Sequence, residues 1–472
     1  MKKFIGVFAF TAIFAISLKA QTNPLLMTTM AVVKDMGLGI NIGNTFEAVI
    51  VCDPGDQGCE NWVNGMETLE TSWGSPAITE AMIRGYANAG FKTIRIPVAW
   101  SNKMAGDEKN GTYTISPALL NRVQEVVGWV LGNGMYAIVN IHYDGGWWEN
   151  FPADSAECMK KYKRVWEQVS NRFKDHSGYL IFESLNEEGV WQDVWNRHNN
   201  SGNKARAYGL LNAINQEFTT LVRASGGNNA NRHLLIAGYA TDINLTSDPM
   251  FEMPADPQNH QAVSVHYYDP FGFTHLTQNE SWAQMRLTWG TTADYDELNG
   301  YMNTLKTTFV ENGIPIIVGE YGVAAPNRSE SEIRKYTLAV AEAIYERNMC
   351  PVLWDVQLND GETQYYYNRK ANPPSLVDQL LVAGFKEITE ENIVAALPQT
   401  ATLNSAFATK NSIFLNVQKS AHLEIYKLNG KQERVLSFKN GAHSVSLVDL
   451  PSGMYIAKVS FGSEKQIFRI TR

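Results

Sequence analysis

Short apolar runs alternate with longer amphipathic stretches over most of the chain, from about residue 36 to residue 383. The short runs predict buried strands, and stretches with apolar residues every three or four positions predict helices. The predicted strands cover residues 37–42, 91–96, 136–141, 179–185, 234–237, 262–265, 314–318 and 352–354. The predicted helices cover residues 77–89, 117–131, 156–174, 205–224, 295–310, 330–347 and 374–383.

This alternation is typical of parallel βαβ units. Eight units across roughly 350 residues predict an α/β fold, the (β/α)8 TIM barrel, with long loops. The link between the strands at 234–237 and 262–265 is mostly irregular, so that unit is the least regular. An open doubly wound sheet is the alternative, but no GxGxxG or Walker A loop supports it.

The pattern changes after about residue 397 to short alternating segments, at 413–417, 423–428, 444–447 and 454–461. Turns are expected at Asn429-Gly430, Asn440-Gly441 and Pro451-Ser452-Gly453. Residues 402–472 contain 10 Lys and Arg but 4 Asp and Glu, whereas the whole chain has a net charge of −8. We therefore expect a separate small all-β sandwich domain over residues 398–472.

Residues 1–20 have the features of a secretory signal peptide. Lys2 and Lys3 precede an apolar run that ends near Leu18, and Ala20 offers a small residue for cleavage. The run is too short for a stable membrane span. The expected division is a signal peptide (1–20), a barrel domain (21–397) and the sandwich (398–472). The protein should then be secreted or held at the cell surface after export through the periplasm.

The chain has four cysteines, and two of them bracket a short loop. Cys52 and Cys59 enclose Pro54, Gly55 and Gly58, so an exported protein can join them in a disulfide bond. A CxxC metal motif is absent from the sequence.

The overall charge and the aromatic content bear on the partner. A net charge of −8 argues against nucleic acid as a partner. The chain has 12 Trp and 20 Tyr, whose flat faces can stack on the apolar faces of sugar rings, although most such residues are ordinarily core residues.

Two glutamates follow apolar strands that lie far apart in the sequence. Glu187 comes after the run that ends at Leu185, and Glu320 comes after the run that ends at Val318. A TIM barrel carries its chemistry at the carboxyl ends of its strands. Each glutamate alone could simply begin a polar loop, but two such carboxylates can face each other across the barrel mouth. Hydrolysis of a glycosidic bond needs such a pair, one as acid and the other as nucleophile or base.

Other polar and aromatic side chains are expected on the same rim. They are Asn44, Arg95, His142, Asn186, His266, Tyr268 and Trp354. No predicted strand ends on Lys, which argues against Schiff-base chemistry. His142 and His266 could bind a metal with Asp144 or Asp269, but the first strand ends in Asn44 rather than in the paired histidines of amidohydrolase-type barrels. We expect no metal and no other cofactor.

These segments resemble glycoside hydrolase family 5 of clan A, over nearly all of residues 30–395. The resemblance rests on FESLNEEG, IVGEYG, TIRIPVAW, VNIHYDGGWW, SVHYYDP and VLWD, in the family's order and each at a strand end. It implies a retaining enzyme in which Glu187 is the acid/base and Glu320 the nucleophile. GINIGNTFEA further resembles the subfamily rich in endoglucanases, lichenases and xyloglucanases.

The resemblance also implies roles for the neighbouring residues. Arg95 and Tyr268 should hold Glu320 ionised and aligned, and Asn186 should bond the sugar 2-hydroxyl. His142 and His266 should orient hydroxyls and carboxylates, and Trp354 should stack under the reacting sugar. Asn44 and Tyr143 complete the expected substrate-binding set, Trp73, Trp147 and Trp148 are expected in outer subsites, and Glu183 is expected to be an ion partner inside the barrel. The charge of Glu320 should raise the pKa of Glu187.

Three positions depart from the family pattern. Glu188 stands where the family usually has Pro after the acid/base, Tyr143 replaces a common second His, and Leu353 replaces a common Trp. These differences affect the loop charge and the sugar subsites rather than the reaction.

The last segment, with LEIYKLNGK and LPSGMYIAKV, resembles the C-terminal sorting domain of the type IX secretion system. The type IX machinery is then an expected partner. An accessory sugar-binding sandwich is the alternative, but this segment has no Trp.

The expected activity is hydrolysis of β-1,4-linked plant glucan or a related polysaccharide by a monomer. An endo-β-mannanase and a catalytically inactive polysaccharide-binding protein are the alternatives. Retention of both Glu187 and Glu320 argues against the inactive protein.

Overall fold

The computed structural model describes residues 23–49, 69–356, 364–389, 405–408, 412–427, 431–447, 449–451 and 453–471. The predicted signal peptide, the Cys52–Cys59 disulfide, the Asn429-Gly430 turn and the boundary between residues 397 and 398 lie outside these ranges. Among the described helices, none is long and apolar enough to span a membrane.

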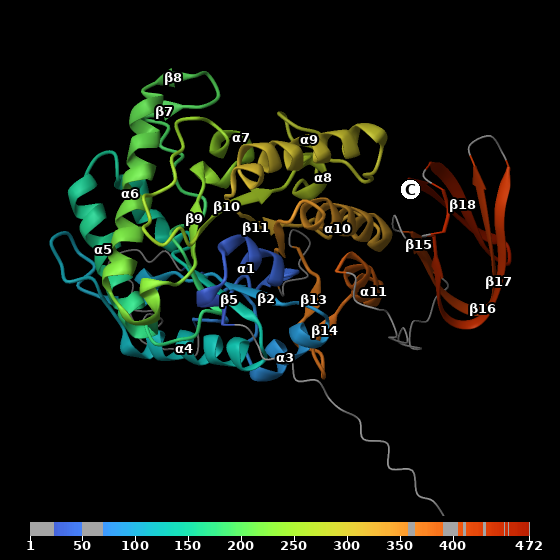
Figure 1. Ribbon diagram of the computed structural model, residues 1–472, viewed down its shortest axis with the longest axis horizontal. Helices are drawn as coiled ribbons and strands as arrows, with labels where there is room; N and C mark the ends of the chain where they lie inside the picture. The colour runs from blue at the N-terminus through green and yellow to red at the C-terminus, as the bar shows by residue number, and fades with distance from the viewer. Residues whose placement is uncertain are drawn as a thin grey trace, which may run out of the picture.

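All eight predicted strands are present, and they close into one parallel barrel, in the order β1-β12-β11-β10-β9-β6-β5-β2 (Figure 1). The strands are β1 (Gly39–Asn41), β2 (Thr93–Ile96), β5 (Tyr136–Asn140), β6 (Leu180–Glu183), β9 (Leu234–Ala237), β10 (Gln261–Tyr267), β11 (Ile316–Tyr321) and β12 (Cys350–Leu353). The TIM-barrel prediction is confirmed, and the open doubly wound sheet is wrong.

Helices surround this barrel. They are α1 (Thr29–Asp35), α3 (Glu80–Asn88), α4 (Pro117–Gly132), α5 (Ser155–Phe173), α6 (Lys204–Ala224), α7 (Ile243–Thr246), α8 (Phe271–Thr274), α9 (Thr292–Thr308), α10 (Glu330–Tyr345) and α11 (Gln379–Ile388). The last predicted helix, at 374–383, lies further along the chain. Ser375–Leu376 pairs as a short strand, and the helix begins only after Asp378, whose side chain accepts the Leu380 N–H at 2.9 Å.

Short elements fill the loops. They are β3 (Met104–Ala105), β4 (Thr114–Ile115), β7 (Trp195–Asn196), β8 (Ser201–Gly202), β13 (Tyr367–Asn368), β14 (Ser375–Leu376) and the 3-10 helices η1 (Pro24–Leu26), η3 (Trp100–Lys103), η4 (Asp144–Asn150), η5 (Gly227–Ala230), η6 (Tyr239–Thr241) and η7 (Val310–Asn312). The irregular link predicted before β10 contains η6 and α7.

The barrel interior changes from apolar to polar along the strands. Ile138, Ile181 and Leu235 cluster with Val32 and Val33 of α1, which was not predicted from the sequence. Side chains two residues apart on a strand point to the same side. Two residues further along β6 and β10, buried Glu183 follows Ile181, and buried Ser264 follows Ala262. The polar layer therefore lies inside the carboxyl end of the barrel.

A five-stranded antiparallel sheet follows the barrel and has its own apolar core. Its strands are β15 (Ser405–Ala408), β16 (Ser412–Lys427), β17 (Gln432–Ser446), β18 (Met454–Phe461) and β19 (Glu464–Thr471). Figure 1 shows it on the side of the barrel that carries α10 and α11.

The prediction of an all-β C-terminal unit is confirmed, with corrections to its strands. The segment 413–417 and the described residues 423–427 of the next segment belong to the single strand β16, whose register shifts between Val417 and Ser420. The turn predicted at Asn440-Gly441 is wrong: β17 continues through these residues, and Gly441 pairs with Val417 beside a bulge whose extra residue lies on β16. β15 and β19 were not predicted.

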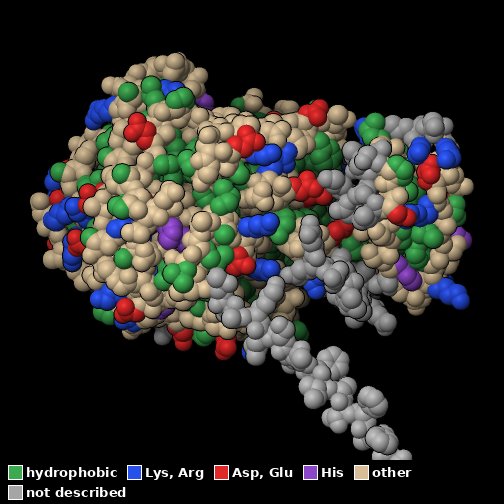
Figure 2. All heavy atoms as spheres, viewed as in Figure 1, with side chains coloured by type: hydrophobic (Ala, Val, Ile, Leu, Met, Phe, Trp, Pro, Cys, Tyr) green, Lys and Arg blue, Asp and Glu red, His purple; other side chains and the backbone are tan. Residues whose placement is uncertain are grey.

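The face in Figure 2 carries acidic and basic side chains interspersed over the barrel. Such mixing of signs is typical of a soluble-protein surface.

Candidate active site

Arg95 is the centre of the polar layer. It lies on β2 and is 0% exposed. Its Nε donates to Glu183 at 2.7 Å, and its terminal nitrogens donate to Glu320 at 2.7 Å, to Asn186 at 2.8 Å and to Asn41 at 3.1 Å. Burial alone lowers the pKa of Arg95, but the charges of Glu183 and Glu320 outweigh burial and raise it above its ordinary value. The guanidinium therefore stays charged and joins four partners from three other strands or strand ends.

The prediction that Glu183 is an interior ion partner is confirmed. Its carboxylate is fully buried, faces Arg95 and accepts a hydrogen bond from Ser264 Oγ at 2.7 Å. A buried carboxylate needs such compensation from charge and hydrogen bonds.

A bulge on β11 brings Glu320 into the barrel mouth. Val265 of β10 pairs with Val318, but the next residue, His266, pairs with Glu320, so Gly319 is an extra residue on β11. A Cβ on Gly319 would lie 3.1 Å from Ser264 Oγ and 3.2 Å from His266 Nε2, so this position has room only for a glycine or for displaced neighbours. Bulges of this kind often redirect a side chain beside an active site.

Glu320 receives two strong donors. Besides Arg95, the Tyr268 hydroxyl donates to its second oxygen at 3.0 Å. Burial, then the charge of Glu320, raises the pKa of Tyr268 well above its ordinary value, so the hydroxyl keeps its proton and donates. The predicted roles of Arg95 and Tyr268 as partners of Glu320 match this geometry.

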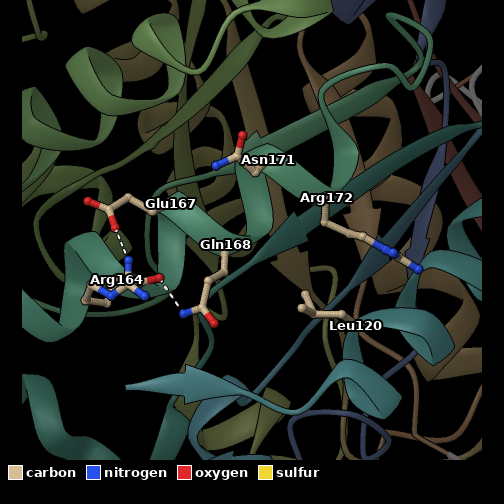
Figure 3. Close-up of a pocket in the computed structure, with 6 residues that line it drawn as sticks. All are labelled: Leu120, Arg164, Glu167, Gln168, Asn171 and Arg172. Carbon is tan, nitrogen blue, oxygen red and sulfur yellow. Dashed lines mark hydrogen bonds and ion pairs between the residues drawn. The ribbon is translucent and has the colours of Figure 1, made fainter. Parts of the chain in front are cut away.

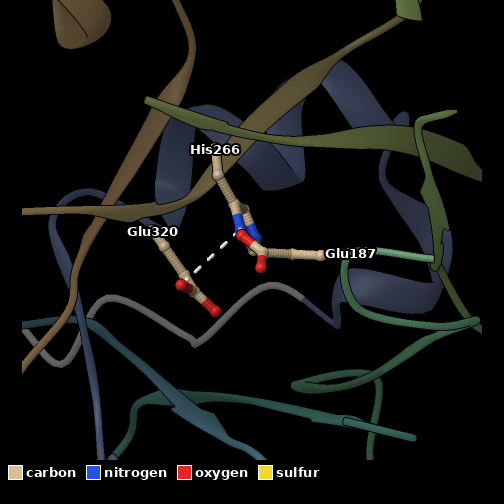
Figure 4. A group of neighbouring side chains, drawn as sticks. All are labelled: Glu187, His266 and Glu320. Carbon is tan, nitrogen blue, oxygen red and sulfur yellow. Dashed lines mark hydrogen bonds and ion pairs between the residues drawn. The ribbon is translucent and has the colours of Figure 1, made fainter. Parts of the chain in front are cut away.

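Glu187 faces Glu320 across His266 (Figure 4). His266 Nδ1 lies 2.7 Å from Glu187 Oε1 and 3.5 Å from Glu320 Oε2. One oxygen of Glu187 and one oxygen of Glu320 lie within 4.8 Å of each other. Half of the Glu187 side chain is exposed, against 7% for Glu320, so Glu187 has the more open position in the mouth.

Desolvation sets the protonation of these groups. It lowers the pKa of His266 to about 4, so the ring is neutral at neutral pH. Desolvation also raises the pKa of Glu187, and Arg95 opposes the rise. The sequence predicted a raised pKa for Glu187, and the structure agrees on this direction. The main cause is burial rather than the charge of Glu320. Because half of the Glu187 side chain is exposed, the effect of burial is weakened. Burial raises the pKa of Glu320 too, whereas the charge of Arg95 lowers it. Because Arg95 donates directly to Glu320, its positive charge favours the ionised form of Glu320.

His142 and Trp354 lie together on another wall of the barrel mouth. Their rings are parallel, with centroids 5.7 Å apart and an interplanar angle of 3°. Burial, Arg95 and His266 hold the pKa of His142 well below its ordinary value, so the ring is neutral. His142 Nδ1 lies 3.3 Å from Asn140 Nδ2, and no contact with Glu187 or Glu320 is seen for it in the described structure. Of the two histidines, it is His266 that contacts the carboxylates in the described structure.

The rim residues Asn44 and Trp354 are supported by buried carboxyl groups. Asn44 has a φ of 58°, and its N–H donates to Glu47, which also accepts the Thr45 N–H at 2.9 Å. Burial raises the pKa of Glu47 to about 7. Asp355, beside Trp354, is fully buried and bonds Arg369 at 3.0 Å.

The remaining predicted residues lie around the mouth with differing exposure. Tyr143 is 46% exposed and Trp73 is 38% exposed. Trp147 donates to Asp144 at 2.8 Å, whereas Trp148 is 8% exposed and belongs mainly to the core. Trp148 is therefore better described as a packing residue than as an outer sugar platform.

The Glu188 carboxyl group provides a hydrogen-bond acceptor just beyond the point where the strand pairing of β6 ends. The pairing of β6 with β9 ends at Glu183, and the Ser184 N–H still reaches Leu235 O at 2.9 Å. Beyond it, the Asn186 N–H donates to the Glu188 carboxyl group, which is 1% exposed. The Glu188 carbonyl accepts the Ala240 N–H at 2.8 Å. Glu188 therefore stabilises the turn that carries Asn186 and Glu187.

The three residues Glu187, His266 and Glu320 could also be considered as cation ligands, because one atom of each lies within 4.8 Å of the others. However, the Arg95 cation donates to Glu320 at 2.7 Å, and Tyr268 occupies its second oxygen. A divalent cation would meet this positive charge, so the donor set suits proton transfer better than metal binding.

A second hollow lies on the outer wall between α4 and α5 (Figure 3). Its lining residues are Leu120, Arg164, Glu167, Gln168, Asn171 and Arg172. Its residues come from the two outer helices, and Arg164 and Glu167 pair with each other in solvent, so it offers no site comparable to the barrel mouth.

Several supporting residues were not predicted from the sequence: Asn41, Ser264, Gly319, Glu47, Asp355 and Arg369. Asn41 carried a usable signal, because it is a polar residue within an apolar strand. Its side-chain amide donates to Gly319 O at 2.9 Å and to Leu353 O at 3.2 Å.

A closed (β/α)8 barrel with two facing carboxylates at its mouth is the architecture of a barrel glycoside hydrolase. The family model "Cellulase (glycosyl hydrolase family 5)" matches residues 55–360. Endoglucanase A of Paenibacillus barcinonensis is 34% identical over 423 residues, which cover 83% of this chain and 96% of the relative. A xyloglucan-specific endo-beta-1,4-glucanase of Bacteroides ovatus is 31% identical, covering 74% of this chain and 68% of the relative.

Solved structures agree with these relatives. A family 5 lichenase from Caldicellulosiruptor sp. F32 is 31% identical, with a TM-score of 0.68 over 78% of this chain and 97% of the lichenase. The chain belongs to glycosyl hydrolase family 5, and it is a cellulase-like glycoside hydrolase.

The Glu188 carboxyl group allows a matched pair of substitutions. Glu188→Ala leaves the buried Asn186 N–H without an acceptor, which should lower the free energy of unfolding by about 1–3 kcal/mol and also reduce kcat. Glu188→Gln keeps an acceptor oxygen and should retain most of the activity. Urea unfolding and steady-state kinetics measure both effects.

The pH profile gives a further check on Glu188. Burial raises its pKa well above the ordinary value, and we expect the protonated form at the working pH, so Glu188→Gln should leave the profile unchanged. If Glu188 were ionised, removing its charge would lower the pKa of Glu187 and move the alkaline limb to lower pH. A shifted alkaline limb, or wild-type behaviour of Glu188→Ala, would contradict this assignment.

Proposed function

We propose that the protein is an exported endo-β-1,4-glucanase that works by double displacement with retention of configuration. The observation that carries the proposal is the pair Glu187 and Glu320. One carboxylate oxygen of Glu187 lies within 4.8 Å of one carboxylate oxygen of Glu320, and His266 lies near both. Retaining enzymes hold their carboxyl groups about 5–5.5 Å apart, and inverting enzymes need about 6.5–9.5 Å for an intervening water.

In the first step, Glu320 attacks the anomeric carbon, and the bond to the leaving oxygen breaks as Glu187 protonates that oxygen. Arg95 and Tyr268 keep the Glu320 carboxylate ionised and aligned for attack. In the second step, Glu187 takes a proton from water, the water oxygen bonds the anomeric carbon, and Glu320 is released.

The reacting sugar is proposed to stack on Trp354, whose ring stands parallel to His142 at the same wall. Asn186, which accepts a hydrogen bond from Arg95, is proposed to bond the 2-hydroxyl. Asn44, His142, His266 and Tyr143 supply further polar contacts around the mouth.

The relatives support β-1,4-linked glucan as the substrate class, because they include endoglucanases, a lichenase and a xyloglucan-specific enzyme. Cellulose, mixed-linkage glucan and xyloglucan all fit this class, and an endo-β-mannanase is the second candidate. A reducing-sugar assay on these three glucans and on mannan identifies the preferred polymer; faster hydrolysis of mannan would overturn the glucanase proposal.

Variants of the two carboxylates test their roles. Glu320→Ala should abolish activity because no glycosyl-enzyme bond can form. Glu187→Ala should fail on polysaccharide, whose alkoxide leaving group needs a proton, but should lose less on an aryl glycoside. Azide should rescue Glu187→Ala and give a β-glycosyl azide.

The control for this series is Glu125→Ala, because Glu125 is an acidic residue on the outer wall with a 52% exposed side chain. It should hydrolyse all substrates as the wild type does. Activity in Glu320→Ala, or an azide product of inverted configuration, would show that the two roles are assigned wrongly.

Export is proposed from the signal-like residues 1–20 and the C-terminal sheet, with the type IX machinery as partner. A chain that ends at Leu397 should hydrolyse soluble glucan at the wild-type rate, because the proposed catalytic residues all belong to the barrel. In a host with type IX secretion it should remain in the cell, whereas the full chain should reach the surface or the medium. Activity in cell fractions measures both outcomes.

The two parts of this proposal fail separately. Loss of hydrolysis in the shortened chain would contradict the division near residue 397. Unchanged export of the shortened chain would contradict the sorting role of the C-terminal sheet.

A further inference from the structure

A row of aromatic side chains leads from the catalytic pair to the surface. We name Phe271, His275 and Trp282 the aromatic shelf. Phe271 is 43% exposed and Trp282 is 67% exposed. Both follow β10, whose end carries His266, so they belong to the loops of the barrel mouth. Large exposed aromatic rings leave apolar surface in water unless a partner covers it.

Ring contacts connect the shelf to the nucleophile. The Tyr268 hydroxyl donates to Glu320 at 3.0 Å, and the ring of Tyr268 meets His275 edge-on with centroids 4.6 Å apart. His275 stacks on Phe271 at 4.5 Å with an interplanar angle of 2°, and Phe271 meets Trp282 at 5.6 Å. Burial lowers the pKa of His275 to about 4, so its ring is neutral and can be part of an apolar row.

The loop that carries the shelf is held by many hydrogen bonds. The Arg286 N–H donates to Gly272 O at 2.8 Å, and the Ala324 N–H donates to Thr274 O at 2.7 Å. Near Trp282, the Glu280 N–H donates to Ala283 O at 2.9 Å. The rings are therefore presented on an ordered support, which lowers the entropy lost when a ligand binds.

The strand order places the shelf opposite the wall of the reacting sugar. Around the closed barrel, β10 is four positions away from β2, which carries Arg95. The wall residues Asn44, His142 and Trp354 follow β1, β5 and β12, respectively. Strands β1 and β5 are the two neighbours of β2, and β12 is the other neighbour of β1. If the sugar before the scissile bond lies on Trp354, the chain beyond that bond extends toward β10.

We propose that the aromatic shelf binds the leaving-group side of a β-glucan chain, by stacking its sugar rings on Phe271 and Trp282. This inference rests on the proposed function and specifies a binding site for the same substrate. The ligand is a neutral, flat, β-linked glucan segment, since the rings offer apolar faces beside polar loop groups such as Asn279 and Gln284.

The test compares Trp282→Ala and Phe271→Ala with the wild type in the full chain. Loss of one stacking ring should lower kcat/KM on cellohexaose about 3- to 10-fold. An aryl β-cellobioside should be cleaved at the wild-type rate, because its leaving group ends before the shelf. Trp282→Phe should keep most of the activity on cellohexaose. Leu26→Ala is the control, because Leu26 is an 83% exposed apolar residue of η1, beside α1 at the opposite end of the barrel.

The cleavage position shows which side of the bond the shelf binds. With cellohexaose labelled at its reducing end, loss of leaving-group sites should shift cleavage toward the label and shorten the labelled product. Lengthening of that product would place the shelf on the other side, and an unchanged pattern with unchanged kcat/KM would overturn the proposal.

Calorimetry separates failure of the shelf from failure of the proposed function. In Glu320→Ala protein, adding Trp282→Ala should weaken cellohexaose binding by a similar factor, whether or not the wild type cleaves the oligosaccharide. Equal affinity with and without Trp282 would overturn the shelf. A wild type that binds cellohexaose through Trp282 but cleaves no glucan would instead contradict the proposed function.

Discussion

The burial of one guanidinium determines the arrangement of this barrel mouth. Arg95 is inaccessible to solvent and donates to Glu183, Glu320, Asn186 and Asn41. A buried charge without partners costs several kcal/mol, so the fold must supply acceptors from every direction. The same contacts that satisfy Arg95 hold the proposed nucleophile and the residue before the proposed acid/base. Stability and function therefore depend on one network. Glu183, inside the barrel, compensates the charge of Arg95, and Glu320, in the mouth, is held by the same charge.

The backbone adapts to this network where regular strands end. On β11, the extra residue Gly319 turns Glu320 into the mouth, and Asn41 bonds the Gly319 carbonyl at 2.9 Å. At the end of β6, where pairing with β9 stops, the Glu188 carboxyl group accepts the Asn186 N–H. Neutral His266 lies between the two carboxylates. Each departure from ideal geometry is compensated by a buried polar contact.

Periodicity predicted the barrel well because each strand is an apolar run and each helix has one apolar face. The rim residues could be named because strand ends are visible in the sequence, as at Glu187 and His266. The bulge at Gly319 could not be predicted, since it depends on pairing between strands that are about 50 residues apart. The contact between Asp355 and Arg369 also depends on the folding of separate segments, and His142 contacts Trp354 rather than the carboxylates for the same reason. In the C-terminal sheet, local turn signals at Asn440-Gly441 misled the prediction because β17 continues through these residues opposite a bulge on β16, and that pairing is not visible in the local sequence.

The central claim is that Glu320 forms a covalent bond to the sugar while Glu187 transfers the proton. The most direct measurement is proton NMR of the first product released from a soluble β-glucan, before the anomers equilibrate. Two displacements at the same carbon predict the β anomer as the initial product. An initial α anomer would mean a single displacement by water, and it would contradict the assignment of Glu320 as nucleophile.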